Sequence, residues 1–168
     1  MNTLLGAIGT SKQKDEKWLT SYIIMNIGYL SRQTVKPLYS DAMEGSSVTI
    51  ESVLELLMFL SHEATRQVLP IRSIRRIKLF VSDRVALSIL TGKRKIPEGV
   101  RVNMKAIRSV IRDPGFIPTV DYEYVLPNEN PAFASLEELE TYAKQAEKML
   151  KNVLGMEEKK NGKKDSNF

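Results

Sequence analysis

The chain contains no cysteine, and among its 168 residues there is a single histidine, His62. Disulfide scaffolds, thiolate zinc sites and cysteine nucleophiles are therefore excluded. Aromatic residues make up only 7% of the sequence, and no apolar run is long enough to cross a membrane. Because no set of residues supplies a general base, a nucleophile and an oxyanion site, we predict that the protein is not an enzyme, with no cofactor and no small-molecule substrate.

The remaining composition is typical of a globular protein, with 42% hydrophobic and 27% charged residues. We predict a mainly α fold of about five helices in one domain, with a small β element near residues 119–126. This mostly helical domain spans residues 1–154, and the lysine-rich tail over 155–168 is predicted to be disordered because it holds almost no apolar residue. With no signal peptide and no membrane span, we expect a cytoplasmic or otherwise intracellular protein that is neither secreted nor transmembrane.

Apolar residues at spacings of three and four predict helices in the first half of the chain. One helix is predicted over residues 15–32, and a second over 50–68, ended by Pro70. Residues 71–81 are ambiguous, because their last part, 77–81, also suits a short buried strand. We interpret the whole segment as a helix.

Two further helices are predicted in the middle of the chain. Ser82 with Asp83 forms the N-cap of one helix, and Gly92 follows its end. Asn103 caps the next helix, which the Asp-Pro-Gly turn beginning at Asp113 closes.

One strand is predicted, because apolar and polar residues alternate strictly from Thr119 to Leu126. A single strand is not stable by itself. It therefore needs a partner, which is residues 77–81, residues 100–102 or a strand of another subunit.

Ser135 and Glu138 form a capping box that begins a last helix. Its apolar residues recur at alternating spacings of three and four, which is typical of a coiled-coil seam. Two interpretations stay open: the helix docks on its own domain, or it pairs between chains and makes the protein a homo-oligomer. The self-association residues in the second case are Leu136, Leu139, Ala143, Ala146, Leu150 and Val153.

Charge is strongly segregated along the chain, whose overall formal charge is +5. Residues 66–112 hold 13 basic and two acidic side chains, net +11, whereas residues 113–158 have a net charge of −7. A dense positive field attracts polyanions, because each phosphate that it neutralises releases counterions. The predicted nucleic-acid-binding residues are Arg72, Arg75, Arg76, Arg84, Lys93, Arg94, Lys95, Arg101, Lys105, Arg108 and Arg112.

Within the basic segment, the run Val-Ser-Asp-Arg-Val-Ala-Leu-Ser-Ile-Leu-Thr-Gly-Lys-Arg-Lys-Ile-Pro over residues 81–97 resembles one part of a known family. It is similar to the recognition helix and following turn of the phage-repressor type of helix-turn-helix domain. The resemblance implies a helix in the DNA major groove, with Asp83, Arg84 and Leu87 near bases and residues 93–95 near phosphates.

No metal site is predicted. His62 begins like a zinc-protease signature, but the residue four positions later is Arg66, which cannot ligate zinc. Asp121 and Glu123 would lie on the same side of the predicted strand, where two carboxylates are more typical of a solvated sheet face than of a cation site.

We therefore predict a non-catalytic nucleic-acid-binding protein that uses the basic surface of residues 66–112 and self-associates. The sequence does not distinguish DNA from RNA. The alternative is an oligomeric assembly protein, viral matrix-like or nucleocapsid-associated, whose basic surface meets an anionic membrane or a neighbouring subunit.

Overall fold

The computed structural model describes residues 3–13, 17–26, 38–40, 44–62 and 73–165. The chain divides into two compact units, unit 1 (Met1–Leu136) and unit 2 (Glu137–Phe168). The predicted end of the ordered domain at residue 154 stays a prediction. Of the helices that are described, none is both long and apolar enough to cross a membrane.

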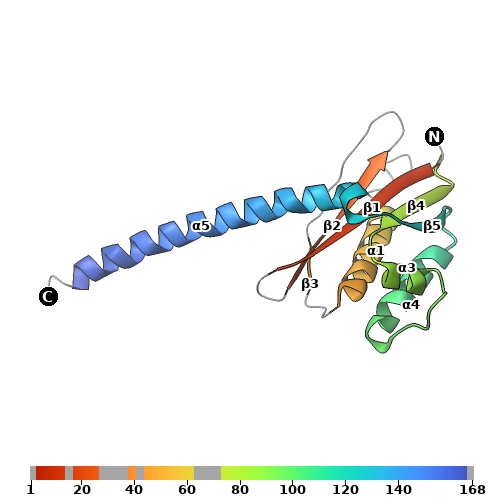
Figure 1. Cartoon of the computed structure of the whole chain (residues 1–168), viewed down its shortest axis with the longest axis horizontal. Coiled ribbons are helices and arrows are strands. Elements are labelled where there is room, and N and C mark those ends of the chain that lie inside the picture. The colour runs from red at the N-terminus through yellow and green to blue at the C-terminus, as the bar shows by residue number, and fades with distance from the viewer. Residues whose placement is uncertain (1–2, 14–16, 27–37, 41–43, 63–72, 166–168) are drawn as a thin grey trace. The chain divides into compact units, whose positions relative to one another are not determined.

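Unit 1 is built on a five-stranded mixed sheet with the strand order β3-β2-β1-β4-β5 (Figure 1). The β1–β2 and β2–β3 pairs are antiparallel, and the β1–β4 and β4–β5 pairs are parallel. The strands are β1 (Thr3–Lys12), β2 (Trp18–Asn26), β3 (Leu38–Ser40), β4 (Arg76–Val81) and β5 (Thr119–Tyr124). The fold is therefore α/β, and the prediction of a mainly α protein is wrong.

Three helices, α1, α3 and α4, lie on one face of this sheet (Figure 1). The helices are α1 (Gly45–Ser61), α3 (Arg84–Leu90), α4 (Arg101–Arg112) and α5 (Pro131–Asp165), with single 3-10 turns η2 (Glu98–Val100) and η3 (Pro127–Glu129). The start of α5, up to Leu136, belongs to unit 1. The helix continues to Asp165, where the sequence predicted disorder from residue 155.

The main core lies between the sheet and α1, α3 and α4. Large apolar side chains from the sheet and from all three helices are completely or almost completely buried. They include Leu4, Ile8, Tyr22, Ile24, Ile50, Leu56, Leu57, Leu60, Ile77, Leu79, Val81, Ile89, Met104 and Ile107. Burial of this kind is the main stabilising term of the domain.

The start of α5 covers the opposite face of the sheet over β1 and β2. Ala7 of β1, Ile23 of β2 and Ala132 of α5 form a second small cluster there. The close approach of α5 to β1 is possible because Gly9 has no side chain. A Cβ atom at this position would lie 2.9 Å from the backbone of Ala132. Both faces of the central strands are therefore buried.

This two-sided burial explains why the helix predicted over residues 15–32 is wrong. In β2 the residues from Leu19 to Ile24 are all buried, whichever face they point to. Alternation disappears when both faces of a strand are covered, and the remaining apolar residues then match a helical spacing by chance. The rest of that segment, residues 27–32, lies outside the described residues.

The segment 76–81 is also a strand and not a helix, since it forms β4, which lies between β1 and β5 in the sheet. It is the parallel partner of β5, so one of the three partners considered for the predicted strand is confirmed. Because α3 follows a strand and no helix directly precedes it, residues 81–97 do not form a helix-turn-helix. The predictions of α1, α3 and α4 as helices are confirmed over residues 50–61, 84–90 and 103–112.

Candidate nucleic-acid interface

The basic segment of the sequence is the crossover connection between the parallel strands β4 and β5. A parallel pair needs such a connection, and here it consists of α3, η2 and α4. Its apolar side packs against the sheet and α1 through Ala86, Ile89, Val100, Met104 and Ile107, all buried. The charged side chains of the connection are consequently directed to solvent.

Helix α4 carries its cations as one stripe. Arg101, Lys105, Arg108 and Arg112 are all exposed and recur at spacings of four, three and four residues, which places them on one helical face. At 1.5 Å per residue the stripe is about 16 Å long. Glu98 is an acidic partner there, with its Oε2 atom 3.1 Å from Nη2 of Arg101.

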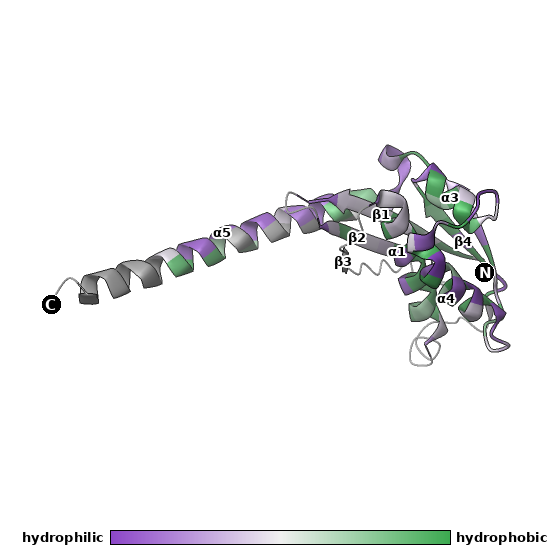
Figure 2. Ribbon diagram, turned by 90° about the horizontal axis from the view of Figure 1, so that it is seen from below, coloured by the Kyte–Doolittle hydropathy of each residue, from purple (hydrophilic) through white to green (hydrophobic). Residues whose placement is uncertain are grey.

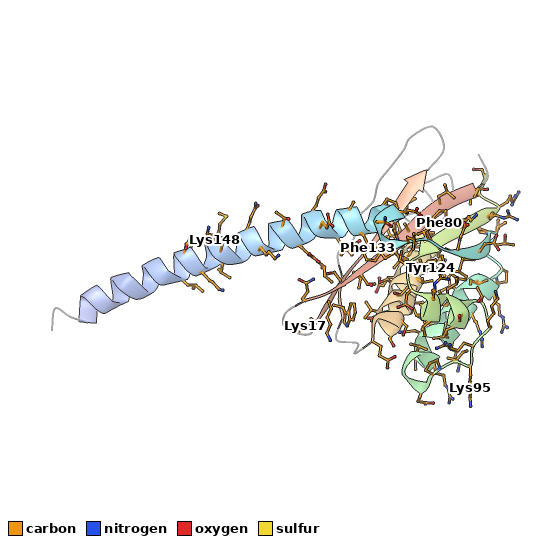
Figure 3. All side chains as sticks on the ribbon, viewed as in Figure 1. Lys17, Phe80, Lys95, Tyr124, Phe133 and Lys148 are labelled. Atoms are coloured by element: carbon orange, nitrogen blue, oxygen red, sulfur yellow. The ribbon has the colours of Figure 1, made fainter. Side chains whose placement is uncertain are left out.

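The turn after α3 adds three consecutive exposed cations, Lys93, Arg94 and Lys95. Gly92 has φ of 77°, a left-handed conformation that glycine adopts easily, and it reverses the chain at the end of α3. The backbone N–H groups of Lys93 and Arg94 both donate to the carbonyl oxygen of Ser88, 2.8 and 3.1 Å away. Figure 3 shows Lys95 at the outer side of this connection, away from the sheet.

Arg84, at the start of α3, has a defined position. Its guanidinium carbon lies 4.0 Å from the centre of the Tyr124 ring on β5, a cation–π contact. The neighbouring Asp83 accepts a hydrogen bond from the N–H of Ala86 at 2.8 Å and thereby caps α3, as predicted. We call the exposed cations of the connection the crossover surface: Arg84, Lys93, Arg94, Lys95, Arg101, Lys105, Arg108 and Arg112.

The predicted cations before the crossover lie elsewhere. Arg76 is on β4 and faces the side of the sheet opposite to α1, where its Nε atom is 3.2 Å from Oδ2 of Asp121. Lys78 makes the same kind of pair with Glu123 at 2.7 Å. Arg75 is exposed just before β4, and Arg72 lies outside the described residues.

Four of the described carboxylates are engaged in structural contacts. Asp83 and Asp113 accept backbone hydrogen bonds, and Asp121 and Glu123 pair with cations of β4. Within the described ranges, no three histidine, cysteine, aspartate or glutamate side chains come together to hold a metal ion. The acidic residues Asp15, Glu16, Asp41 and Glu63 lie outside those ranges.

One polar centre was missed by the sequence argument. The side-chain amide of Asn130, which is 3% exposed, donates to the carbonyl oxygen of Ile8 at 2.8 Å and to Oγ of Ser82 at 3.0 Å. Its amide oxygen accepts the N–H of Ala132, while Ser82 donates to the carbonyl oxygen of Val125. Asn130 thus joins β1, the end of β4, the segment after β5 and the start of α5.

The predicted self-association residues are divided between the two units. Leu136 is 2% exposed and belongs to unit 1, where it lies beside Gly9. Ala146, Leu150 and Val153 are exposed in unit 2. The side chains of Leu139 and Ala143 lie outside the description.

Comparison with known proteins identifies solved structures that have a similar fold. No family model matches the chain, and no curated protein matches it. The structure is similar to that of LC11-RNase H1, isolated from compost by a metagenomic approach, with a TM-score of 0.60 and 11% identity over 83% of this chain and 93% of that chain. RNase H1 from the halophilic archaeon Halobacterium salinarum gives a TM-score of 0.58 and 11% identity over 80% and 93%. LC11-RNase H1 in complex with an RNA/DNA hybrid gives 0.60 and 9% identity over 76% and 88%.

At these identities the likeness shows the fold, which is that of ribonuclease H. It corrects the resemblance to phage-repressor helix-turn-helix domains, since the solved structures named above are RNase H1 proteins. The same solved structures contradict the prediction that the protein is not an enzyme, because these structural neighbours are ribonucleases. That prediction considered only sets of side chains that supply a base, a nucleophile and an oxyanion site, whereas a bound metal ion can generate the nucleophile from water.

Proposed function

We propose that this protein binds double-stranded nucleic acid through the crossover surface. The observation that carries the proposal is the stripe of four exposed cations on α4, together with the three cations of the preceding turn. A duplex presents one phosphate charge per about 1.7 Å of its axis, so a stripe of this length meets several phosphates at once. The solved structure of LC11-RNase H1 in complex with an RNA/DNA hybrid supports a duplex as the ligand of this fold.

The chemistry of the crossover surface favours backbone contacts over base contacts. Its residues are arginine and lysine, and the one aromatic ring in contact with them, Tyr124, is already covered by Arg84. Stacking of unpaired bases needs free aromatic faces, which this surface does not offer among its described residues. Binding is therefore expected to be sequence-independent and to depend on salt.

The proposal is tested by titrating fluorescent duplexes of DNA, RNA and RNA/DNA hybrid with the full chain at about 50 mM salt. The test variant is Lys105→Gln, Arg108→Gln and Arg112→Gln, three exposed positions on one face of α4. Glutamine keeps the helix propensity and removes only charge. We expect the variant to bind all three duplexes at least 30-fold more weakly, at roughly 0.7 kcal/mol or more per lost contact.

A matched control removes the same number of charges elsewhere. Lys144, Lys148 and Lys151 are exposed on α5 in unit 2, and their replacement by glutamine leaves the crossover surface intact. We expect this control to bind like the wild type, which would separate a local surface from an effect of net charge. Equal losses in the two variants, or no binding by the wild type, would overturn the proposal.

The same incubations with added Mg²⁺, resolved on a denaturing gel, report whether either strand is cut. Vesicles containing anionic lipid are included as a competing ligand. Tight vesicle binding with no duplex binding would favour the membrane alternative over the proposal.

A further inference from the structure

Unit 2 carries an apolar stripe whose members are exposed. Met149 is 70% exposed, Leu150 59%, Val153 53% and Leu154 49%. Together with Ala146 they span roughly 140° of the helix at 100° per residue, which is one face. Figure 2 shows hydrophobic and hydrophilic residues alternating along this part of α5.

The other side of the helix is polar. Thr141, Lys144, Lys148, Lys151 and Asn152 are exposed and lie opposite the stripe by helical spacing. A helix gains most of its stability from burying such an apolar face, since isolated helices are marginal in water. The stripe therefore requires a partner surface.

Charge along α5 indicates which partner fits. Residues 137–147 hold four acidic and one basic side chain, net −3, whereas residues 148–165 hold six basic and three acidic side chains, net +3. A second copy of the same helix in the parallel direction would place like charges side by side. In the antiparallel direction the acidic part of one copy runs along the basic part of the other.

We propose that two copies of the chain associate through unit 2 as an antiparallel pair of α5 helices, with Leu150 and Val153 at the centre of the contact. Such a contact uses the same patch on both copies and closes as a dimer. It also gives the assembly two crossover surfaces, which raises the avidity for a long duplex without any new contact. The proposal does not depend on nucleic-acid binding, and its failure would leave that proposal standing.

The first test measures the molar mass of the full chain by size-exclusion chromatography with light scattering at about 10–100 μM. We expect a dimer for the wild type. Leu150→Gln with Val153→Gln should weaken the dimer by more than about 100-fold, because each buried aliphatic side chain contributes strongly to association. The matched control, Thr141→Gln with Asn152→Gln, changes the polar side of the same helix and should leave the dimer intact.

A monomeric wild type, or a stripe variant that remains dimeric with unchanged helix content by circular dichroism, would overturn the proposal. Loss of the dimer in the control as well would also overturn it, because the stripe would then not be the contact.

The second test determines whether the two α5 helices pair in the parallel or the antiparallel direction. Because the chain has no cysteine, a spin label attaches only at the cysteine that is introduced. A spin label on Thr141→Cys lies about 10 residues before the centre between Leu150 and Val153, so an antiparallel pair separates the two labels by roughly 30 Å along the axis. A parallel pair leaves only the interaxial distance of about 10 Å plus the label lengths. A label on Asn152→Cys should give a short distance. Two short distances would overturn the antiparallel arrangement.

Discussion

Asn130 is a buried residue whose side chain connects several segments around the sheet. It is buried, and three hydrogen bonds of its side chain join segments from β1 to α5. Removing the Asn130 side chain would leave its hydrogen-bond partners buried and unsatisfied. This desolvation penalty lowers stability more than the loss of the hydrogen bonds themselves.

Asn130→Ala is therefore expected to lower the free energy of unfolding by about 3 kcal/mol. Asn128, two residues earlier and exposed, supplies the control, because its replacement by alanine should change stability by less than about 0.5 kcal/mol. Urea unfolding followed by circular dichroism measures both values. Equal stabilities of the two variants would show that the network contributes nothing.

Tyr22 is the second residue whose environment makes a prediction. Its ring is buried, and the centres of the Tyr22 and Phe59 rings lie 6.0 Å apart. No hydrogen-bond partner of the Tyr22 hydroxyl is found among the described residues. Burial, assisted by the nearby charge of Glu55, raises the pKa of Tyr22 to about 12 from the ordinary 10.0. Burial also raises the pKa of Tyr122.

Between pH 10 and pH 12 the folded state keeps the Tyr22 proton that the unfolded state loses, so the free energy of unfolding falls as pH rises. Tyr22→Phe should make this fall shallower, with the part due to Tyr122 remaining. At pH 7 the variant should be as stable as the wild type, or more stable by about 1 kcal/mol, because a buried hydroxyl without a partner is removed. Thermal unfolding at pH 7 and between pH 10 and pH 12 provides the measurement. A clear destabilisation of Tyr22→Phe at pH 7 would contradict the prediction.

At the scale of elements, the position of the first turns of α5 depends on the absence of a side chain at Gly9. A Cβ atom there would lie 2.9 Å from both the backbone of Ala132 and a methyl group of Leu136. The backbone cannot yield as a flexible side chain can, so the helix start would have to move away from the sheet.

Gly9→Ala is expected to cost about 2 kcal/mol of stability. The control is Gly99→Ala, since no atom lies within 4 Å of a Cβ built at Gly99. Differential scanning calorimetry should show a lower Tm for the first variant and a nearly unchanged Tm for the second. A wild-type Tm for Gly9→Ala would show that α5 does not pack as described.

Some elements could be predicted from the sequence because their local pattern and their environment agree. Strand β5 has one face toward the helices and one face open, so its residues alternate, and α4 packs on one side only, so its cations form a stripe. Strands β1, β2 and β4 lie inside the sheet, and in β2 burial on both faces removes the alternation that identifies a strand. The sheet order depends on contacts between distant segments, which no local pattern contains.

At the scale of the whole molecule, the sequence predicted the charge of the crossover surface but not its position. The net charge of residues 66–112 was visible in the sequence, whereas the pairing of Arg76 with Asp121 depends on strand order and could not be seen. The prediction that the protein is not an enzyme is contradicted by solved structures of the same fold, and this fold is not revealed by any local set of residues in the sequence. Asn130 carries no signal by itself, since asparagine is also an ordinary turn residue.

The most direct test of the central claim is the salt dependence of duplex binding, measured between about 50 and 200 mM salt for the wild type and the α4 variant. The slope of log K against log salt reports the number of phosphates neutralised, at about 0.9 per phosphate on B-form DNA. With Lys105, Arg108 and Arg112 replaced by glutamine, we predict a slope smaller in magnitude by about 3 than that of the wild type. Parallel lines for the two proteins would contradict the account, because the cations of α4 would then touch no phosphate.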